Sequence, residues 1–285
     1  MTRFVDRMLA GEVPTSDDWR EHLLQFHEKY PEATSRAFRR LTDAVGRSSY
    51  EILADAAVGD GHAPARILDV GCGDGTLLEI LGRRVPSAEL FGIDLCESDV
   101  VRARARLTAN SGRIIVGDAA QIPFPSGSID LVVSHLALML IPNVEPVISE
   151  IRRIVAPGGR LVFVTDLPGA ISGELTEAFR AVREVLVSEY PHIARAVVSD
   201  PRIYDSEAID KLLSSIGFPA VPKREINEVT SFLEGDDLWR FIETTYFVGL
   251  LDRRLSDRIR TKICDRTASG RAMVTMPLQL TTVDC

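Results

Sequence analysis

The stretch DVGCGDG at residues 69–75 decides how this chain is expected to fold, because it places three glycines between a buried strand and a helix. The run ARILDV at 65–70 predicts a short buried strand, and TLLEILGRR at 76–84 predicts the helix that follows. Glycine allows the sharp turn, often through positive φ, and lets a ligand approach the backbone closely. The free N–H groups at the start of the helix would then face that ligand.

Strand and helix patterns alternate on both sides of this turn. Further strands are predicted at residues 89–94, 113–118, 129–135 and 160–166, and further helices at 99–107 and 145–155. This alternation predicts an α/β fold with a mostly parallel sheet covered by helices on both faces, joined by right-handed crossovers.

The two ends of the chain carry helical additions to this core. Before residue 60, one helix is predicted from the spacing of Trp19, Leu23, Phe26 and Tyr30, after capping candidates at 16 and 17, and two more around 38–45 and 50–53. After residue 166, helices are predicted at 174–190, 206–216 and 237–266, with weak strand patterns at 223–232 and 271–283. We therefore divide the chain into an N-terminal helical lid (1–60), a ligand-binding core (61–167), a helical insertion (168–204) and the end of the core (205–285), which holds a second helical insertion at 234–270.

Composition and charge exclude several classes of protein. The chain has 285 residues, 45% of them hydrophobic and 26% charged, which is typical of a globular protein. Its 33 Lys and Arg against 41 Asp and Glu give a net charge of −8, which argues against a dedicated nucleic-acid partner. There is no signal-peptide pattern and no long apolar run, so we expect a cytoplasmic protein without a membrane partner. Neither a disulfide framework nor a metal site is predicted from the four widely spaced cysteines, Cys72, Cys96, Cys264 and Cys285.

Two acidic residues at expected strand ends point to a nucleoside. Asp94 ends the second strand, 19 residues after Gly75, where a carboxylate accepts hydrogen bonds from ribose hydroxyls. Asp118 ends the third strand and could accept from an adenine amino group. The alternatives are a plain tight turn at the glycines, a helix N-cap at Asp94 and a turn residue at Asp118.

Four stretches together resemble class I S-adenosylmethionine-dependent methyltransferases of the UbiE-like, small-molecule type. They are ILDVGCGDGTLLEIL at 67–81, FGIDL at 91–95, GDAAQIPFPSGSIDLVVSHLALML at 117–140 and EIRRIVAPGGRLVFV at 150–164. The resemblance implies a Rossmann-like seven-stranded sheet that closes with an antiparallel hairpin, whose last strand, at 272–283, inserts back into the sheet. It also implies S-adenosylmethionine as the cofactor and S-adenosylhomocysteine as the product.

The resemblance assigns roles to individual residues. Asp69 would support the amino-acid end of the cofactor, Asp94 would bind the ribose, Leu95 would pack on the adenine, and Ser134 would lie under the sulfonium. The glycine loop would line the cofactor with Gly71, Cys72, Gly73 and Gly75. Asp118 and Ala119, after the third strand, would fix the adenine edge.

Methyl transfer to an oxygen or nitrogen of a small, largely apolar metabolite is the predicted function. Three helical additions beside one crevice would build an apolar pocket, and by resemblance such enzymes often serve natural-product tailoring. The alternatives are a methyltransferase-fold protein that binds the cofactor but acts as a cyclase or binding module, and a C-methyltransferase. A nicotinamide enzyme is disfavoured because the glycine pattern is D-x-G-x-G-x-G.

Histidines are the candidates for a catalytic base. His135 follows the fourth strand at the edge of the crevice and could take a proton near neutral pH; its alternative is a packed, inert side chain. His27 on the N-terminal helix and His192 after the fifth strand are further candidates. We expect His22 and His62 to be surface or loop residues. The arginines of the run RARAR at 102–106, which are Arg102, Arg104 and Arg106, are expected to form a solvated helix face.

Overall fold

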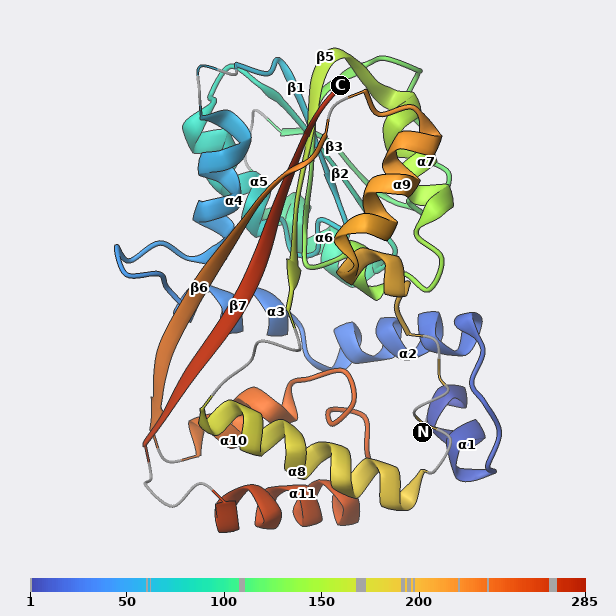
Figure 1. The fold of residues 1–285 in the computed structure, drawn as a ribbon, viewed down its shortest axis with the longest axis vertical. Helices are drawn as coiled ribbons and strands as arrows, with labels where there is room; N and C mark the ends of the chain where they lie inside the picture. Colours follow the sequence, from blue (N-terminus) through green and yellow to red (C-terminus); the bar gives the residue numbers. More distant parts are fainter. Residues whose placement is uncertain are drawn as a thin grey trace.

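The computed structural model describes residues 2–59, 61, 63–107, 111–167, 173–190, 193, 196, 198–219, 221–234, 236–266 and 271–285. A seven-stranded sheet in the order β3-β2-β1-β4-β5-β7-β6 forms its centre (Figure 1). The strands are β1 (Arg66–Val70), β2 (Glu89–Asp94), β3 (Ser111–Val116), β4 (Ile129–His135), β5 (Val155–Asp166), β6 (Lys223–Glu234) and β7 (Arg271–Asp284).

Strand pairing confirms the predicted Rossmann-like topology. β1 pairs in parallel with both β2 and β4, and the strands outside them, β3 and β5, are parallel as well. β7 runs antiparallel between β5 and β6, so the last strand inserts into the sheet as expected. All five parallel strands therefore end at the same edge, where ligands bind in open α/β sheets.

Helices cover both faces of the sheet. One face carries α4 (Ser49–Val58), α5 (Thr76–Arg84) and α6 (Glu97–Arg106), and the other carries α7 (Glu145–Ile154) and α9 (Ser206–Ile216) (Figure 1). Each strand sends alternate side chains to the two faces. In β1, Ile67 packs into the first apolar cluster and Leu68 into the second, and both are fully buried.

A layer of helices lies beyond the carboxyl edge of the strands (Figure 1). We call α8 (Glu174–Glu189), α10 (Asp237–Glu243), residues 244–252 and α11 (Arg253–Arg266) the helical cap. The helix α2 (Ser16–Lys29) runs between this cap and the sheet, and α1 (Arg3–Leu9) and α3 (Ala33–Arg40) flank it. Apolar side chains of the cap join the first core cluster, so the cap is packed onto the core.

Local differences from the sequence-based prediction have clear causes. The N-cap of α2 is Thr15, whose side chain accepts from the Asp18 backbone N–H in a capping box, one residue before the predicted cap. The helix predicted through 38–45 ends at Arg40, because the Thr42 backbone pairs with Thr230 on the edge of β6. The helix predicted at 237–266 is broken between α10 and α11.

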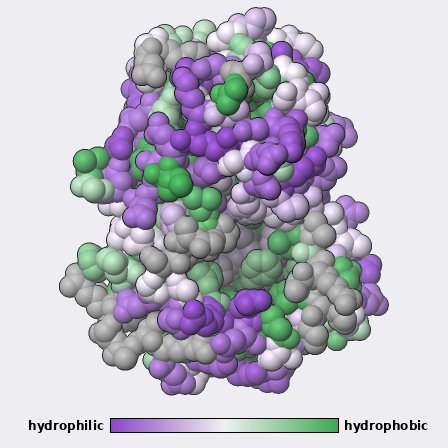
Figure 2. Space-filling view, viewed as in Figure 1, coloured by the Kyte–Doolittle hydropathy of each residue, from purple (hydrophilic) through white to green (hydrophobic). Residues whose placement is uncertain are grey.

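The surface shows no single large apolar area in the view of Figure 2. Hydrophobic residues on this face gather in small groups among hydrophilic ones. Among the described residues, no helix combines the length and apolar character needed to cross a membrane.

Candidate functional site

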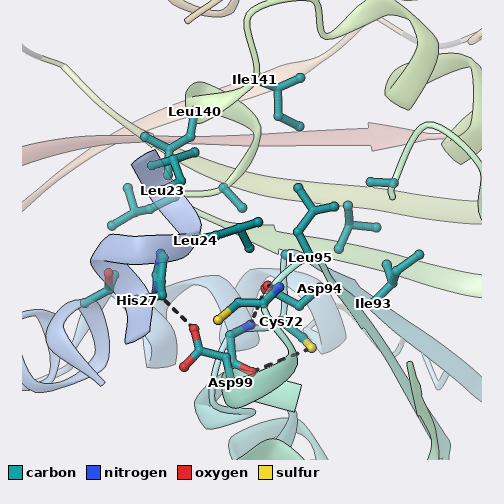
Figure 3. A pocket seen from close by; sticks show the side chains of 18 of the residues that line it. Leu23, Leu24, His27, Cys72, Ile93, Asp94, Leu95, Asp99, Leu140 and Ile141 are labelled. Carbon is teal, nitrogen blue, oxygen red and sulfur yellow. Dashed lines mark hydrogen bonds and ion pairs between the residues drawn. The ribbon is translucent and has the colours of Figure 1, made fainter. Parts of the chain in front are cut away.

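A cavity of about 340 Å³ opens at the carboxyl edge of the sheet, within the size range of small-molecule pockets. Its floor comes from the ends of β1, β2 and β4 and the residues after β3, and its roof from α2 and Tyr246 of the cap. Figure 3 shows Leu23, Leu24 and His27 of α2 facing Asp94 and Leu95 across this space. The cavity therefore lies where the sequence predicted a nucleoside site.

The glycine loop forms one wall of the cavity. Gly71 has a φ of +73°, and a Cβ there would lie 2.3 Å from the Ala137 Cβ, so no larger residue fits. Gly73 has a φ of +49° and open space around it, and its backbone N–H donates to Asp94 Oδ2 at 2.8 Å. Gly75 begins α5 and packs against Ala103 of α6; it does not line the cavity. The structure therefore places Gly75 in helix packing, and its expected cofactor contact stays a prediction.

Asp69 presents a buried carboxyl to the cavity. Its exposed fraction is 2%, and Oδ1 has no hydrogen-bond partner among the residues that the structure describes. Burial, reinforced by the charges of Asp94 and Asp74, raises the pKa of Asp69 well above its usual value. A buried acceptor without a partner is costly unless a ligand supplies the donor, and the α-ammonium group of S-adenosylmethionine is such a donor. This orphaned oxygen fits the cofactor that the sequence resemblance implies.

The expected nucleoside contacts also lie on the cavity. Asp94 accepts from the backbone N–H groups of Gly73 and Cys96, both at 2.8 Å, and burial raises its pKa. Leu95 is 37% exposed and lines the cavity, as an adenine-packing residue would. Asp118 and Ala119 line it as well, and Asp118 Oδ1 accepts from the Ala120 N–H at 2.9 Å.

Of two other residues from the expected cofactor set, Ser134 lies away from the cavity and Cys72 lines it. Ser134 is fully buried in β4, and its hydroxyl donates to the Val70 carbonyl oxygen at 2.8 Å. It does not line the cavity, whereas His135 at the end of β4 and Leu136 and Ala137 just after it do. Side chains alternate along a strand, and position 134 points into the sheet packing, so the structure offers no support for the predicted place of Ser134 under the sulfonium. Cys72 lines the cavity, and burial raises the pKa of its thiol well above the usual value.

His135 lies on the cavity wall but is enclosed. Its Nε2 is 2.8 Å from the Ser49 hydroxyl, and its ring stacks on Tyr50 with centroids 3.8 Å apart. Burial lowers the pKa of His135 to about 3, so the ring is neutral at physiological pH. A general base is most effective with a pKa near the working pH, which His135 does not have.

The remaining histidines divide between the cavity, the core and the undescribed segments. His27 lines the cavity and pairs through Nδ1 with Asp99 Oδ2 at 2.9 Å (Figure 3). His22 is 2% exposed; its Nε2 donates to the Tyr246 carbonyl oxygen at 2.7 Å, which corrects its expected surface position. His192 and His62 lie outside the described residues.

The arginine run on α6 is also more than a solvated face. Arg104 donates to the Ile114 carbonyl oxygen on β3, and Arg106 donates to both the backbone and the carboxylate of Asp74 in the glycine loop. Arg104 remains exposed, as expected, whereas the Arg106 side chain is only 21% exposed, which corrects the expectation for Arg106. The run anchors the loop that forms the cavity wall.

Several cavity residues escaped the sequence prediction. Arg20, on the roof, pairs with Asp118, and Trp19 donates from Nε1 to the Leu140 carbonyl oxygen at 3.0 Å. Tyr246 reaches the roof from the cap, far away in sequence. The positions 16, 20, 23, 24 and 27 form one helical stripe, which was a usable signal for the roof. Among the described residues, no group of three or more His, Cys, Asp or Glu side chains could hold a metal ion.

Comparison with known proteins identifies the segment around the cavity. Residues 68–163 match the family model described as "Methyltransferase domain". The chain is 37% identical over 123 residues to malonyl-[acyl-carrier protein] O-methyltransferase of Methylococcus capsulatus, covering 43% of this chain and 44% of that protein. It is 35% identical over 120 residues to demethylmenaquinone methyltransferase of Thermus thermophilus, covering 41% and 54%. The chain thus spans about half the length of these curated relatives.

The fold extends beyond that segment. The crystal structure of the [4+2]-cyclase SpnF aligns with a TM-score of 0.56 at 18% sequence identity, covering 95% of this chain and 96% of that one. At this identity the likeness shows a shared fold, and the aligned region covers nearly all of this chain, helical additions included.

Proposed function

We propose that the chain, whose residues 68–163 match a methyltransferase domain, is a class I S-adenosylmethionine-dependent methyltransferase that transfers the cofactor's methyl group to an oxygen or nitrogen of a small, largely apolar metabolite. Natural-product tailoring is the setting we propose. In the same proposal, residues 61–167 bind the cofactor, and residues 1–60, 168–204 and 234–270 shape the acceptor site.

The observation that carries the proposal is the placement of three of the carboxylates that line one cavity. Asp69, Asp94 and Asp118 line the same space, at the ends of β1 and β2 and just after β3. Asp69 is suited to the cofactor's ammonium group, Asp94 to its ribose hydroxyls and Asp118 to its adenine amino group. Each carboxylate can accept the donors that its part of the cofactor offers.

When bound, the cofactor supplies an activated methyl group on a sulfonium sulfur. The chain's own contribution is then alignment of the acceptor and exclusion of water. Gly71 allows the backbone to approach, and Leu136 and Ala137 after β4 shape the wall beside it. Holding two reactants in line can lower a barrier by about 7 kcal/mol or more in favourable cases.

The acceptor side of the cavity is mainly apolar. Side chains from α2 and from the segment after β4 line it: Trp19, Leu23, Leu24, Leu140, Ile141, Pro142 and Val147. A lining of this character with few polar groups is typical of sites for small molecules. The relatives named for malonyl-[acyl-carrier protein] and demethylmenaquinone act on different acceptors. We therefore infer the acceptor class of this chain from the lining of its own cavity.

We propose that His135 contributes as a neutral wall residue, because its Nε2 is bonded to Ser49. His27, bonded to Asp99, remains the other described candidate for proton removal. An amine acceptor needs no base once it is neutral, whereas a hydroxyl acceptor needs its proton removed during transfer.

The decisive experiment is incubation with S-adenosylmethionine carrying a labelled methyl group and a panel of phenols, amines and carbon acids. Mass spectrometry and NMR then locate the methylated atom. A labelled O- or N-methyl product supports the proposal, and a C-methyl product would move the chain to C-methyl transfer. Tight cofactor binding with unlabelled, rearranged products would instead make it a cyclase on the same fold.

A further inference from the structure

Helix α2 has two different faces. Toward the cavity it presents Arg20, Leu23, Leu24 and His27, with Arg20 and His27 seven residues, or about two turns, apart. Toward the helical cap it presents a buried aromatic face, to which Trp19, His22 and Phe26 belong. Since the cavity face covers the cofactor-binding wall, whatever holds α2 down also controls access to it.

The attachment of α2 to the cap is dense. Trp19 stacks on Phe247 with centroids 5.7 Å apart, and Phe26 packs on Tyr246 at 4.6 Å. His22 donates to the Tyr246 carbonyl oxygen. Further along the helix, the side chains of Lys29 and Tyr30 both donate to the Gly249 carbonyl oxygen. Buried aromatic contacts of this kind make α2 and residues 244–252 one packed unit.

The attachment of α2 to the cofactor side is sparser and ionic. Arg20 pairs with Asp118 at one end of the stripe, and His27 pairs with Asp99 at the other. The side chains of Arg20 and Asp118 are 47% and 32% exposed, so their pair lies at the mouth of the cavity. Trp19 adds one hydrogen bond to Leu140. Arg20, His27 and Trp19 thus supply polar contacts between α2 and the cofactor side of the cavity.

We propose that Arg20 is a positioning residue that latches α2 across the adenine end of the cavity and so limits the rate of cofactor exchange. The proposal rests on S-adenosylmethionine as the cofactor. Arg20 lines the same cavity as Leu95, Asp118 and Ala119, and it makes its pair with the carboxylate that would receive the adenine amino group. Arg20 therefore closes the mouth beside the adenine.

Asp118 can hold the latch and the adenine together. A carboxylate has about four lone-pair sites. One oxygen accepts from the Ala120 N–H and the other from Arg20, so sites remain for an adenine amino group. The latch consequently persists with and without the cofactor, and it slows entry and release alike.

Replacing Arg20 by Met tests the latch, since Met keeps the length of the side chain and removes the charge. Calorimetry with S-adenosylmethionine and with S-adenosylhomocysteine gives the Kd of each. A chase of tritiated S-adenosylmethionine gives its dissociation rate, and this rate divided by the Kd of S-adenosylmethionine gives its association rate. An exposed ion pair of ordinary strength predicts that both rates rise about 1.5- to 5-fold while Kd changes less than about twofold. Arg20→Lys should retain slow exchange, and Arg240→Gln, which removes an exposed ion pair on α10, serves as the matched control.

Each other result overturns the latch. A faster dissociation with unchanged association would make Arg20 a direct cofactor contact, and the reverse would make it a competitor for Asp118. Unchanged rates would make the pair incidental. Raising the salt concentration should speed exchange in the natural protein more than in Arg20→Met, because salt screens an exposed pair. If the natural protein bound no S-adenosylmethionine, the proposed function would fail, independently of the latch.

Discussion

Replacing Asp69 by Asn is expected to stabilise the cofactor-free protein and to weaken cofactor binding, two effects of opposite sign from one isosteric change. Asp69 is buried, its Oδ1 lacks a partner within the described part of the chain, and its carboxylate faces the charges of Asp94 and Asp74. The buried negative charge of Asp69 therefore destabilises the cofactor-free protein, and a positively charged ligand would remove this destabilisation. An amide has the same shape without the charge.

The magnitude depends on pH in a definite direction. The pKa of Asp69 is raised in the folded protein, so the native state keeps a proton that the unfolded chain loses. Stability of the natural protein from this group therefore falls as pH rises from the ordinary value of 3.8 through the raised pKa. Above that pH we expect Asn to add about 1 kcal/mol to the free energy of unfolding, which for a chain of this size is roughly 2–4 °C in Tm. The lost charge-assisted contact should weaken cofactor binding by about 1.5–3 kcal/mol, or roughly 10- to 150-fold.

Thermal unfolding at pH 5 and pH 8, with and without S-adenosylhomocysteine, measures both effects. The variant should gain most at pH 8 without ligand, and the ligand should raise its Tm less than that of the natural protein. Asp17→Asn, which removes an exposed carboxylate from the same cavity, is the control for overall charge. A variant that is less stable than the natural protein at pH 8 would refute the reasoning, because it would mean that Asp69 is stabilised by a partner in the free protein.

Three further results are expected. Asp94→Ala should weaken S-adenosylmethionine and S-adenosylhomocysteine binding roughly 10- to 150-fold in calorimetry, through loss of the ribose contact; unchanged affinity would exclude Asp94 from the site. Deletion of residues 1–45 should lower Tm sharply and not merely slow turnover, because it uncovers Tyr246 and Phe247 of the cap; a truncated protein with native Tm would contradict the packing. Since the pKa of His135 falls from 6.5 to about 3, stability should decline as pH drops through that window, and less steeply in His135→Gln, in acid unfolding curves; an acidic limb of turnover near 6.5 that vanishes in this variant would restore His135 as a base.

The core was predictable because its signals are local. The turn at 69–75, the alternation of strands and helices, and the acidic residues at strand ends follow from backbone geometry that a sequence pattern records directly. The resemblance supplied what periodicity could not, namely the inserted antiparallel strand β7. Even there, residue-level roles were less secure. Ser134 and Gly75 carried the right types at the right spacing, yet one points into the sheet and the other packs on α6.

The roof and cap were less predictable because they depend on contacts distant in sequence. His22 looked like a surface residue, since nothing near it in the chain reveals that the Tyr246 carbonyl lies 224 positions away. Arg106 looked solvated for the same reason, although its partner Asp74 lies on the glycine loop. A buried polar group needs a partner, and the sequence shows the need without showing the partner.

Helix α2 explains why amphipathic pattern alone misjudges such elements. A helix on a surface has one apolar stripe, but α2 lies between two layers and uses two stripes of different chemistry. The aromatic stripe with Trp19 and Phe26 is the one that a hydrophobic pattern finds, and it belongs to the cap. The mixed stripe with Arg20 and His27 faces the cavity and carries the polar groups that touch Asp118 and Asp99. Because the second stripe mixes charged and apolar positions, its pattern is that of an ordinary solvated face. Its acidic partners, Asp99 on α6 and Asp118 after β3, reveal that it closes a binding site.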